Sequence, residues 1–182
     1  MAELNPPKDV LRGSTLGDAH VADFARRTSH LAGESTVILN FRGIEDATAS
    51  YLKRFFLPLL DDSSGIKVRA MVFPLVAEIS DDVRDALHSF LSEKSWVVSE
   101  VQSNPTGVSF VGLLGNPESS TEETFNLVQR HQASSAFSLF EASQDNRITQ
   151  TAWNNRLTNL VILRLAKRSK QGRVWIYQTT FS

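Results

Sequence analysis

Two kinds of apolar pattern alternate along the first part of the chain, and this alternation restricts the fold more than any other feature. Residues 18–31, 50–60 and 81–91 carry apolar side chains at helical spacing. Short runs rich in β-branched residues separate them at 36–41 and 68–76. Helices that alternate with buried strands are typical of α/β proteins with a partly parallel sheet. We therefore expect an α/β fold here.

Residues at the ends of these segments indicate where the helices begin and stop. Gly33 is expected to close the first helix. Asp46 or Thr48 is expected to cap the second helix, in which Pro58 kinks or shortens the chain. Ser80 is expected to cap the third helix, and the two aspartates that follow it suit the positive end of a helix.

The alternating segments end in a predicted pair of strands and a linker. Residues 96–101 and 108–114 read as two strands around the turn at 104–107. Residues 115–120 have the Gly, Pro and Ser composition of a linker, which we place at residues 116–120. We therefore expect a first domain over residues 1–115 and a second over residues 121–182.

One motif in the first domain resembles a known family. The stretch VILNFRGIEDATASYLKRFF is a hydrophobic strand, a Gly-Ile turn and a serine at the start of a helix. The matching residues are Asn40, Phe41, Gly43, Ile44 and Ser50. The pattern resembles the STAS-like α/β family, related to the anti-sigma-factor antagonists, over about residues 15–115. The resemblance implies a mixed sheet with helices and a sensing or protein-interaction role.

Ser50 is the regulatory residue that this resemblance implies. In the antagonist relatives the matching serine is phosphorylated to switch partner binding, and a helix N-terminus favours phosphate. The Asp-Ser-Ser-Gly run of those relatives is Thr48-Ala49-Ser50-Tyr51 in this chain. We favour the simpler interpretation, in which Ser50 begins a helix and makes a local hydrogen bond.

Helices are also expected at the start of the second domain. Thr121 is expected to cap one of them, with Glu122 and Glu123 in its first turn. Residues 133–142 predict another, with Ala136, Leu139 and Phe140 on its buried side. Residues 147–149 form either a very short strand or the approach to the next helix.

The segment that closes the chain has a helical pattern followed by a basic turn and a strand. The expected helix covers residues 151–166, and its buried side comprises Leu157, Leu160, Val161 and Leu165. Its opposite side is uncharged and polar, with Gln150, Thr151, Asn154, Asn155, Thr158 and Asn159. A basic tight turn at residues 167–173 and a strand from residue 174 follow.

Such side chains suit contact with duplex DNA. Asn and Gln pair with adenine edges, and Thr contacts the thymine methyl group. Lys and Arg neutralise phosphates, which makes the affinity depend on salt. The other interpretation is that the polar face and the charges are only solvated, and we favour DNA because helix, basic turn, Gly172 and strand follow in order.

The TAWNNRLTNL segment resembles the helix that winged-helix transcription regulators of bacteria insert into the groove. The resemblance covers residues 130–180 and implies base contacts from Thr151, Asn154, Asn155 and Thr158. It implies that Lys170 and Arg173, at the wing, contact the DNA backbone or minor groove, and Lys167 and Arg168 of the basic turn are also expected to bind DNA. Arg156 either reaches a phosphate or braces the helices, and both interpretations stay open. Trp153 and Trp175 are expected to pack in the core or the wing.

Charge is divided unequally along the chain. The formal net charge is −1, yet residues 147–182 hold seven Lys or Arg and no acidic residue. Residues 1–118 hold 11 basic and 16 acidic residues, and residues 119–182 hold 8 basic and 4 acidic residues. We therefore expect nucleic-acid contact only in the second domain.

Several functional classes lack their sequence signals. The chain has no cysteine, and its four histidines are isolated from one another. Walker, dinucleotide-binding, His-Glu-x-x-His and Gly-x-Ser-x-Gly patterns are absent, so we expect no enzyme, metal or cofactor. The Asp61-Asp62 and Asp81-Asp82 pairs are better explained by loop polarity and capping than by a metal. Without a membrane-length apolar run or a secretory signal, we expect a cytoplasmic protein.

These observations predict a DNA-binding transcription regulator with an N-terminal sensing or protein-interaction domain. A protein partner for the first domain and a homodimer on two DNA half-sites are expected. The alternative is a non-enzymatic scaffold module of a larger bacterial complex that uses the winged helix for docking. RNA binding is a weaker third interpretation.

Overall fold

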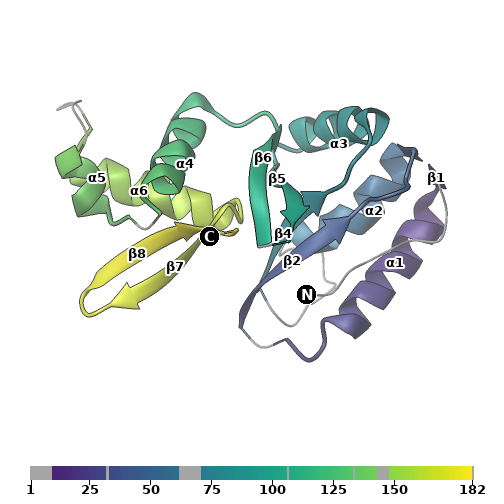
Figure 1. The fold of residues 1–182 in the computed structure, drawn as a ribbon, viewed down its shortest axis with the longest axis horizontal. Helices are drawn as coiled ribbons and strands as arrows, with labels where there is room; N and C mark the ends of the chain where they lie inside the picture. Colours follow the sequence, from purple (N-terminus) through teal and green to yellow (C-terminus); the bar gives the residue numbers. More distant parts are fainter. Residues whose placement is uncertain are drawn as a thin grey trace. The chain divides into compact units, whose positions relative to one another are not determined.

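The computed structural model describes residues 10–31, 33–61, 71–105, 107–132, 134–142 and 148–181. The chain divides into two compact units, unit 1 over Met1–Asn116 and unit 2 over Pro117–Ser182. Figure 1 shows their helices and strands. Each unit has its own elements, and each is described by itself.

Unit 1 contains a four-stranded mixed sheet, which confirms the α/β class. Its strands are β2 (Glu34–Asn40), β4 (Met71–Ala77), β5 (Val97–Asn104) and β6 (Gly107–Gly115). The order is β2-β4-β5-β6, in which β2, β4 and β5 run parallel and β6 is antiparallel to β5. The strands β1 (Val10–Leu11) and β3 (Asp46–Ala47) form a separate parallel pair.

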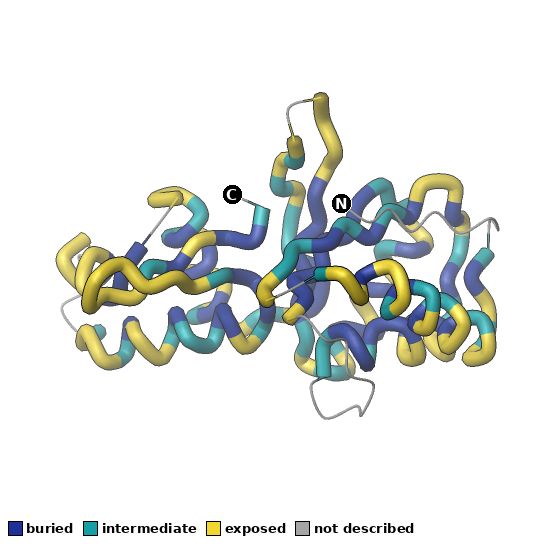
Figure 2. The backbone as a smooth tube through the Cα atoms, turned by 90° about the horizontal axis from the view of Figure 1, so that it is seen from below, coloured by how far each residue is buried: buried dark blue, intermediate teal, exposed yellow. Residues whose placement is uncertain are grey.

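Three helices share one hydrophobic core with this sheet. They are α1 (Ser14–Arg27), α2 (Ala49–Leu60) and α3 (Asp81–Glu93). The core takes alternate residues from the strands, namely Val37, Leu39, Val72, Val76 and Val98. Neighbouring residues such as Phe73 and Leu75 are also buried, so both faces of β4 are apolar, as in the interior strands of parallel sheets. Figure 2 shows this burial along the strands, with exposed ends on β5 and β6.

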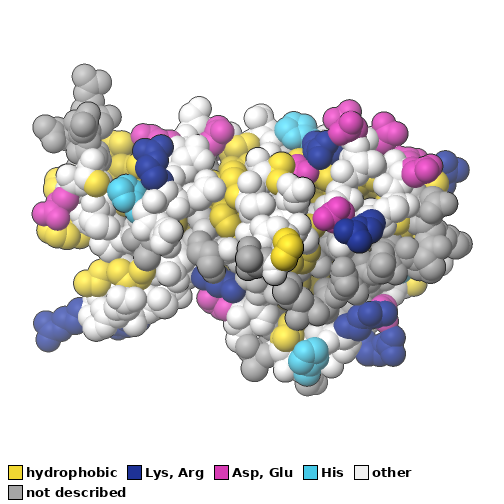
Figure 3. Space-filling view, in the orientation of Figure 1, with side chains coloured by type: hydrophobic (Ala, Val, Ile, Leu, Met, Phe, Trp, Pro, Cys, Tyr) yellow, Lys and Arg dark blue, Asp and Glu magenta, His cyan; other side chains and the backbone are white. Residues whose placement is uncertain are grey.

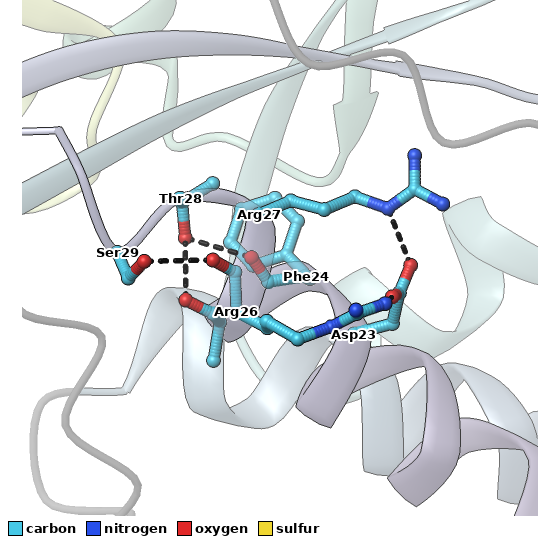
Figure 4. A network of polar contacts seen from close by, with 7 residues as sticks. Asp23, Phe24, Arg26, Arg27, Thr28 and Ser29 are labelled. Carbon is cyan, nitrogen blue, oxygen red and sulfur yellow. Dashed lines mark hydrogen bonds and ion pairs between the residues drawn. The ribbon is translucent and has the colours of Figure 1, made fainter.

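Helix α1 begins and ends four residues earlier than the sequence predicts. It starts after Gly13, whose φ is 82°, and stops at Arg27. Figure 4 shows the reason for the stop: the Thr28 hydroxyl donates to the Phe24 carbonyl at 2.8 Å, and the Ser29 hydroxyl donates to the Arg26 carbonyl at 2.8 Å. The Phe24 carbonyl also accepts the Thr28 N–H at 2.9 Å, so the two hydroxyls add further bonds to carbonyls in the last turn of the helix. The expectation that Gly33 closes the helix is therefore wrong.

The other helices of unit 1 begin as the sequence predicts. Thr48 is the residue that caps α2, because its hydroxyl accepts the Tyr51 N–H. Asp46, the alternative cap, lies in β3. Pro58 lies within α2 and does not shorten it, since the helix continues to Leu60. Ser80 caps α3 as expected.

Not every predicted segment lies within the described residues. Strand β4 is described from Met71, so the expected start at 68–70 lies outside them. Thr106 in the expected turn, Ala133 in the expected helix and Arg147 also lie outside. The strand pair of β5 and β6 is confirmed, with an irregularity between Glu100 and Val101.

The described residues of unit 2 form three helices followed by a hairpin. The helices are α4 (Ser119–His131), α5 (Ala136–Ala142) and α6 (Gln150–Ile162). The strands β7 (Ala166–Gln171) and β8 (Val174–Thr179) pair antiparallel. Between α4 and α5, Ser134 pairs with Tyr177 of β8 through backbone hydrogen bonds of 2.9 and 2.8 Å. Through this bridge, Ser134 acts as a third, one-residue strand beside β8.

Helix α4 begins before the predicted cap. Ser119 and Ser120, expected in a linker, are its first residues, and Glu118 is its N-cap residue. Thr121 is therefore inside the helix, where it is buried. The Thr124 hydroxyl donates to the Ser120 carbonyl at 2.6 Å. The expected capping role of Thr121 is wrong.

Helix α5 is shorter than predicted, and one of its expected core residues is exposed. Ser135 and Ser138 hydrogen-bond each other's backbone N–H at 3.0 and 2.8 Å, so the helix begins after Ser135. Ala136 and Leu139 are buried as expected, but Phe140 is 41% exposed. The expectation that Phe140 lies in the core is wrong.

Candidate nucleic-acid interface

Helix α6 is anchored at its start by a cap and along one side by the core of unit 2. The Thr149 hydroxyl accepts the Ala152 N–H at 3.2 Å, so residues 148 and 149 lead into the helix and form no strand. Trp153, Leu157, Leu160 and Val161 are buried. Helices α4 and α5 both pack against α6. The burial fixes which side of α6 faces outward.

Helix α6 ends four residues before the predicted end. Arg164 adopts a left-handed φ of 60°. The Leu165 N–H bonds to the Leu160 carbonyl at 2.8 Å, and the Arg164 N–H bonds to the Val161 carbonyl at 3.0 Å. This is the pattern of a Schellman motif, which usually has Gly or Asn at the left-handed position. Ala166 therefore begins β7 instead of ending the helix.

The outward side of α6 is uncharged and polar, as the sequence predicts. Thr151, Asn154 and Asn155 are exposed, and Thr158 is half-buried. The Thr158 hydroxyl donates to the Asn154 carbonyl at 2.8 Å. Within the described part of the chain, no side-chain hydrogen bond engages the amide of Asn154 or Asn155. Both amides are free to bind a ligand.

Two other polar residues of α6 point to α4 instead. The Arg156 guanidinium donates to the Glu123 carboxylate at 3.0 Å and lies 5.2 Å from the ring centroid of Trp153. The Asn159 amide donates to the Thr121 hydroxyl at 3.3 Å. These contacts join α6 to α4. They agree with the bracing interpretation of Arg156.

The exposed face of α6 also includes an apolar residue that the sequence reasoning missed. Ile162 is 68% exposed. It lies 11 residues after Thr151, which is close to three full turns of helix, so both residues share one face. The spacing of 11 residues from Thr151 could have placed Ile162 on the exposed face. It was not assigned there because it is apolar and adjoins the buried Val161.

The basic residues lie mainly on a strand and not in a tight turn. Lys167, Arg168 and Lys170 belong to β7, and only Gly172 and Arg173 connect β7 to β8. Gly172 has a φ of 61°, which a two-residue hairpin turn with a left-handed first residue requires. The prediction of a turn over all of residues 167–173 is wrong, because pairing continues to Gln171 and Val174.

Trp175 is not a core residue, because it is 42% exposed on the hairpin. The Arg168 guanidinium lies 4.8 Å from its ring centroid, and the Lys170 ammonium lies 5.8 Å from it. Both cations are attracted by the face of the indole ring. Trp175 therefore packs within the hairpin, with two positive charges close to its ring.

The hairpin is a concentrated source of positive charge. Arg168, Lys170 and Arg173 are exposed, and none of them forms an ion pair with a carboxylate of the described residues. Lys167 is half-buried. Figure 3 shows Lys and Arg side chains gathered at the hairpin tip. An uncharged α6 face and a cationic hairpin thus follow each other in the chain.

In unit 1, Ser50 lies near the N-terminus of α2, as the sequence predicts. It is the second residue of α2 and is exposed. Its hydroxyl lies 3.2 Å from the Thr48 hydroxyl. This local contact is the one expected of a helix-start serine, and a helix N-terminus is also suited to a phosphate.

The contacts shown for His20, His88 and Glu100 are structural ones within unit 1. No group of three His, Asp or Glu residues there is placed to hold a metal ion. His20 Nδ1 lies 2.8 Å from the Tyr51 hydroxyl, and His88 Nδ1 accepts the Gly115 N–H at 3.2 Å. Burial lowers the pKa of His20, although the nearby Asp23 charge opposes this effect. The Arg84 guanidinium pairs with the buried Glu100 carboxylate at 2.8 Å.

In the described part of the chain, no helix has both the length and the apolar character needed to cross a membrane. Comparisons of the chain with protein-family models, with curated proteins and with solved structures found no match.

Proposed function

We propose that this chain binds double-stranded DNA through unit 2, with α6 in the major groove and the β7–β8 hairpin against the phosphates. The observation that carries the proposal is the direct succession of an uncharged amide face and a cationic hairpin. Asn154 and Asn155 have free amides that suit base edges. Arg168, Lys170 and Arg173 have exposed charges that suit phosphates.

The order of elements in unit 2 supports the proposal. Helix, one-residue strand, two helices and two strands succeed each other, and the Ser134–Tyr177 bridge joins the first strand to the last. This order resembles that of winged-helix modules, in which the second and third helices form a helix-turn-helix. By this resemblance α5 is the positioning helix, α6 is the recognition helix and the hairpin is the wing.

We further propose that the protein is a cytoplasmic, non-enzymatic transcription regulator. Unit 1 then senses a signal or binds a protein partner, as its resemblance to STAS-like domains implies, with Ser50 as the candidate phosphorylation site. Its excess of acidic residues suits a surface that stays away from DNA. Two chains would occupy two half-sites one helical turn apart.

A fluorescence-anisotropy titration of a random-sequence duplex at low salt tests the proposal. We expect the logarithm of the binding constant to fall linearly with the logarithm of the salt concentration. Replacing Arg168, Lys170 and Arg173 together by alanine should make this slope shallower by about three units, since each lost phosphate contact removes about 0.9 unit. The matched control replaces Arg12, Arg42 and Lys53 of unit 1 by alanine and leaves the slope unchanged. Absence of duplex binding by the full chain would exclude this function.

A protein-docking role is the second candidate, and one observation favours it. Phe137 and Phe140 of α5 are 51% and 41% exposed. Exposed aromatic side chains are typical of protein interfaces. In this alternative, unit 2 is a scaffold module of a larger complex. Replacing the hairpin cations then leaves the affinity for nucleic acid unchanged. The anisotropy titration separates the two functions, and single-stranded RNA as a competitor detects the RNA-binding alternative.

A further inference from the structure

We infer that α6 selects A·T base pairs through the major groove, so that the preferred duplex carries a run of A·T pairs where α6 lies. The inference rests on the proposed function and adds the chemical class of its target. The evidence for it is the set of side-chain types that α6 exposes, together with the types that its exposed face lacks.

The exposed stripe of α6 is long enough to read several base pairs. Thr151, Asn154, Asn155, Thr158 and Ile162 follow the spacing of one helical face. From Thr151 to Ile162 the helix rises about 16 Å, which spans roughly five base pairs at 3.4 Å each. No member of the stripe is charged, so its contacts discriminate by hydrogen bonds and apolar surface.

The two asparagines suit adenine. An Asn amide accepts a hydrogen bond from adenine N6 and donates one to adenine N7, which requires both amide atoms to be free. Asn154 and Asn155 meet this requirement, because they are exposed and no side-chain bond within the described residues engages their amides. Gln150, at the start of α6, is also exposed and has the same donor and acceptor pair.

The apolar part of the stripe suits thymine, the partner of adenine. Ile162 is 68% exposed and has no polar group, so the thymine methyl group is the base-edge feature that it contacts best. The Thr158 hydroxyl is engaged by the Asn154 carbonyl, which leaves the Thr158 methyl group for the same contact. Adenine and thymine therefore both find complementary side chains on α6.

G·C pairs find no such complement. Guanine is usually read by Arg or Lys, and the cytosine amino group by Asp or Glu. Helix α6 has no acidic residue, and its one basic residue, Arg156, pairs with Glu123 of α4. Arg164 follows the helix and is buried. The exposed face of α6 thus lacks the side-chain types that favour either base of a G·C pair.

Base analogues in otherwise identical duplexes separate major-groove reading from other causes of an A·T preference. With the full chain, we expect a central A·T block to bind on the order of a hundredfold more tightly than a G·C block, from two Asn–adenine pairs. An inosine·cytosine block has the major-groove edge of G·C and the minor-groove pattern of A·T, so it should bind as weakly as G·C. Replacing adenine by 7-deazaadenine, or thymine by uracil, should weaken binding to the A·T block.

Variants assign the preference to residues. Asn154→Ala combined with Asn155→Ala should remove most of the A·T preference and leave salt-dependent binding, and Ile162→Ala should reduce discrimination between thymine and uracil. Asn126→Ala, on the exposed side of α4, is the matched control and should change neither. Salt-dependent binding without a base preference, or equal binding to A·T and inosine·cytosine, would overturn the inference and leave the proposed function. No binding to any duplex would overturn both.

Discussion

The sequence left two roles open for Arg156, contact with a phosphate and bracing of the helices, and stability measurements test the second. Its side chain is 25% exposed and pairs with Glu123, which is 56% exposed. We predict that Arg156→Ala and Glu123→Ala are coupled in stability by about 0.2–1 kcal/mol, the range of partly exposed ion pairs. Urea unfolding of both single variants and of the double variant measures this coupling.

The same variant tests whether Arg156 contacts DNA. Because its guanidinium is held by Glu123 and Trp153, Arg156→Ala should leave the salt dependence of duplex binding unchanged. Arg168→Ala is the comparison, and it should reduce the slope by about 0.9 unit. An equal reduction by Arg156→Ala would show that Arg156 binds a phosphate.

Burial of single residues was predicted only where spacing is unambiguous. Leu157, Leu160 and Val161 are buried as their helical spacing indicates. Phe140 was assigned to the core because it follows Ala136 and Leu139 at helical spacing, but α5 has only seven residues and Phe140, near its end, is 41% exposed. Trp175 was assigned to packing, yet its partners are Arg168 and Lys170, which a hydrophobic pattern does not reveal.

At the scale of elements, the packing of α1 against α2 depends on Gly17. A Cβ atom at Gly17 would lie 2.7 Å from Arg54 Cβ and 3.0 Å from the Tyr51 carbonyl oxygen. We predict that Gly17→Ala destabilises the protein by about 1–3 kcal/mol through this overlap, although alanine is intrinsically favoured in helices by about 1 kcal/mol. Urea unfolding measures the free energy.

Gly112→Ala in β6 is the matched control, because a Cβ atom at Gly112 meets nothing within 4 Å and its φ is not left-handed. It should have a much smaller effect. If Gly17→Ala is as stable as the unaltered protein, α1 and α2 can move apart at no cost, and their close approach at Gly17 does not contribute to the free energy of unfolding.

Most elements were predictable, and their ends were less so. The sequence identified the three helices and the four-stranded sheet of unit 1 but not the two-residue strands β1 and β3, and Thr48 and Ser80 marked helix starts correctly. The end of α6 was missed because its left-handed residue is Arg164 instead of glycine. The Ser134–Tyr177 bridge was also beyond prediction, since a one-residue rung has no periodicity.

For the whole molecule, the charge division along the sequence corresponds to a division into two units. The basic segment at the end of the chain becomes α6 and the β7–β8 hairpin of unit 2, and the acidic excess belongs to unit 1. The sequence alone predicts which unit is acidic and which is basic, because formal charge depends only on residue type. Which cations pair with a carboxylate is a property of the fold: Arg156 does, and Arg168 does not within the described residues.

The absence of cysteine allows the most direct measurement of the central claim, that unit 2 binds DNA with α6 in the major groove. Asn155→Cys and Asn126→Cys each create a single thiol, which is labelled with an iron chelate that cleaves nearby DNA. We predict that the label at position 155 of the full chain cleaves a bound duplex at one localised site, with the offset between strands expected of the major groove. The label at position 126 should cleave weakly or not at all. Equal cleavage from both positions, or none from position 155 on a bound duplex, would contradict the account.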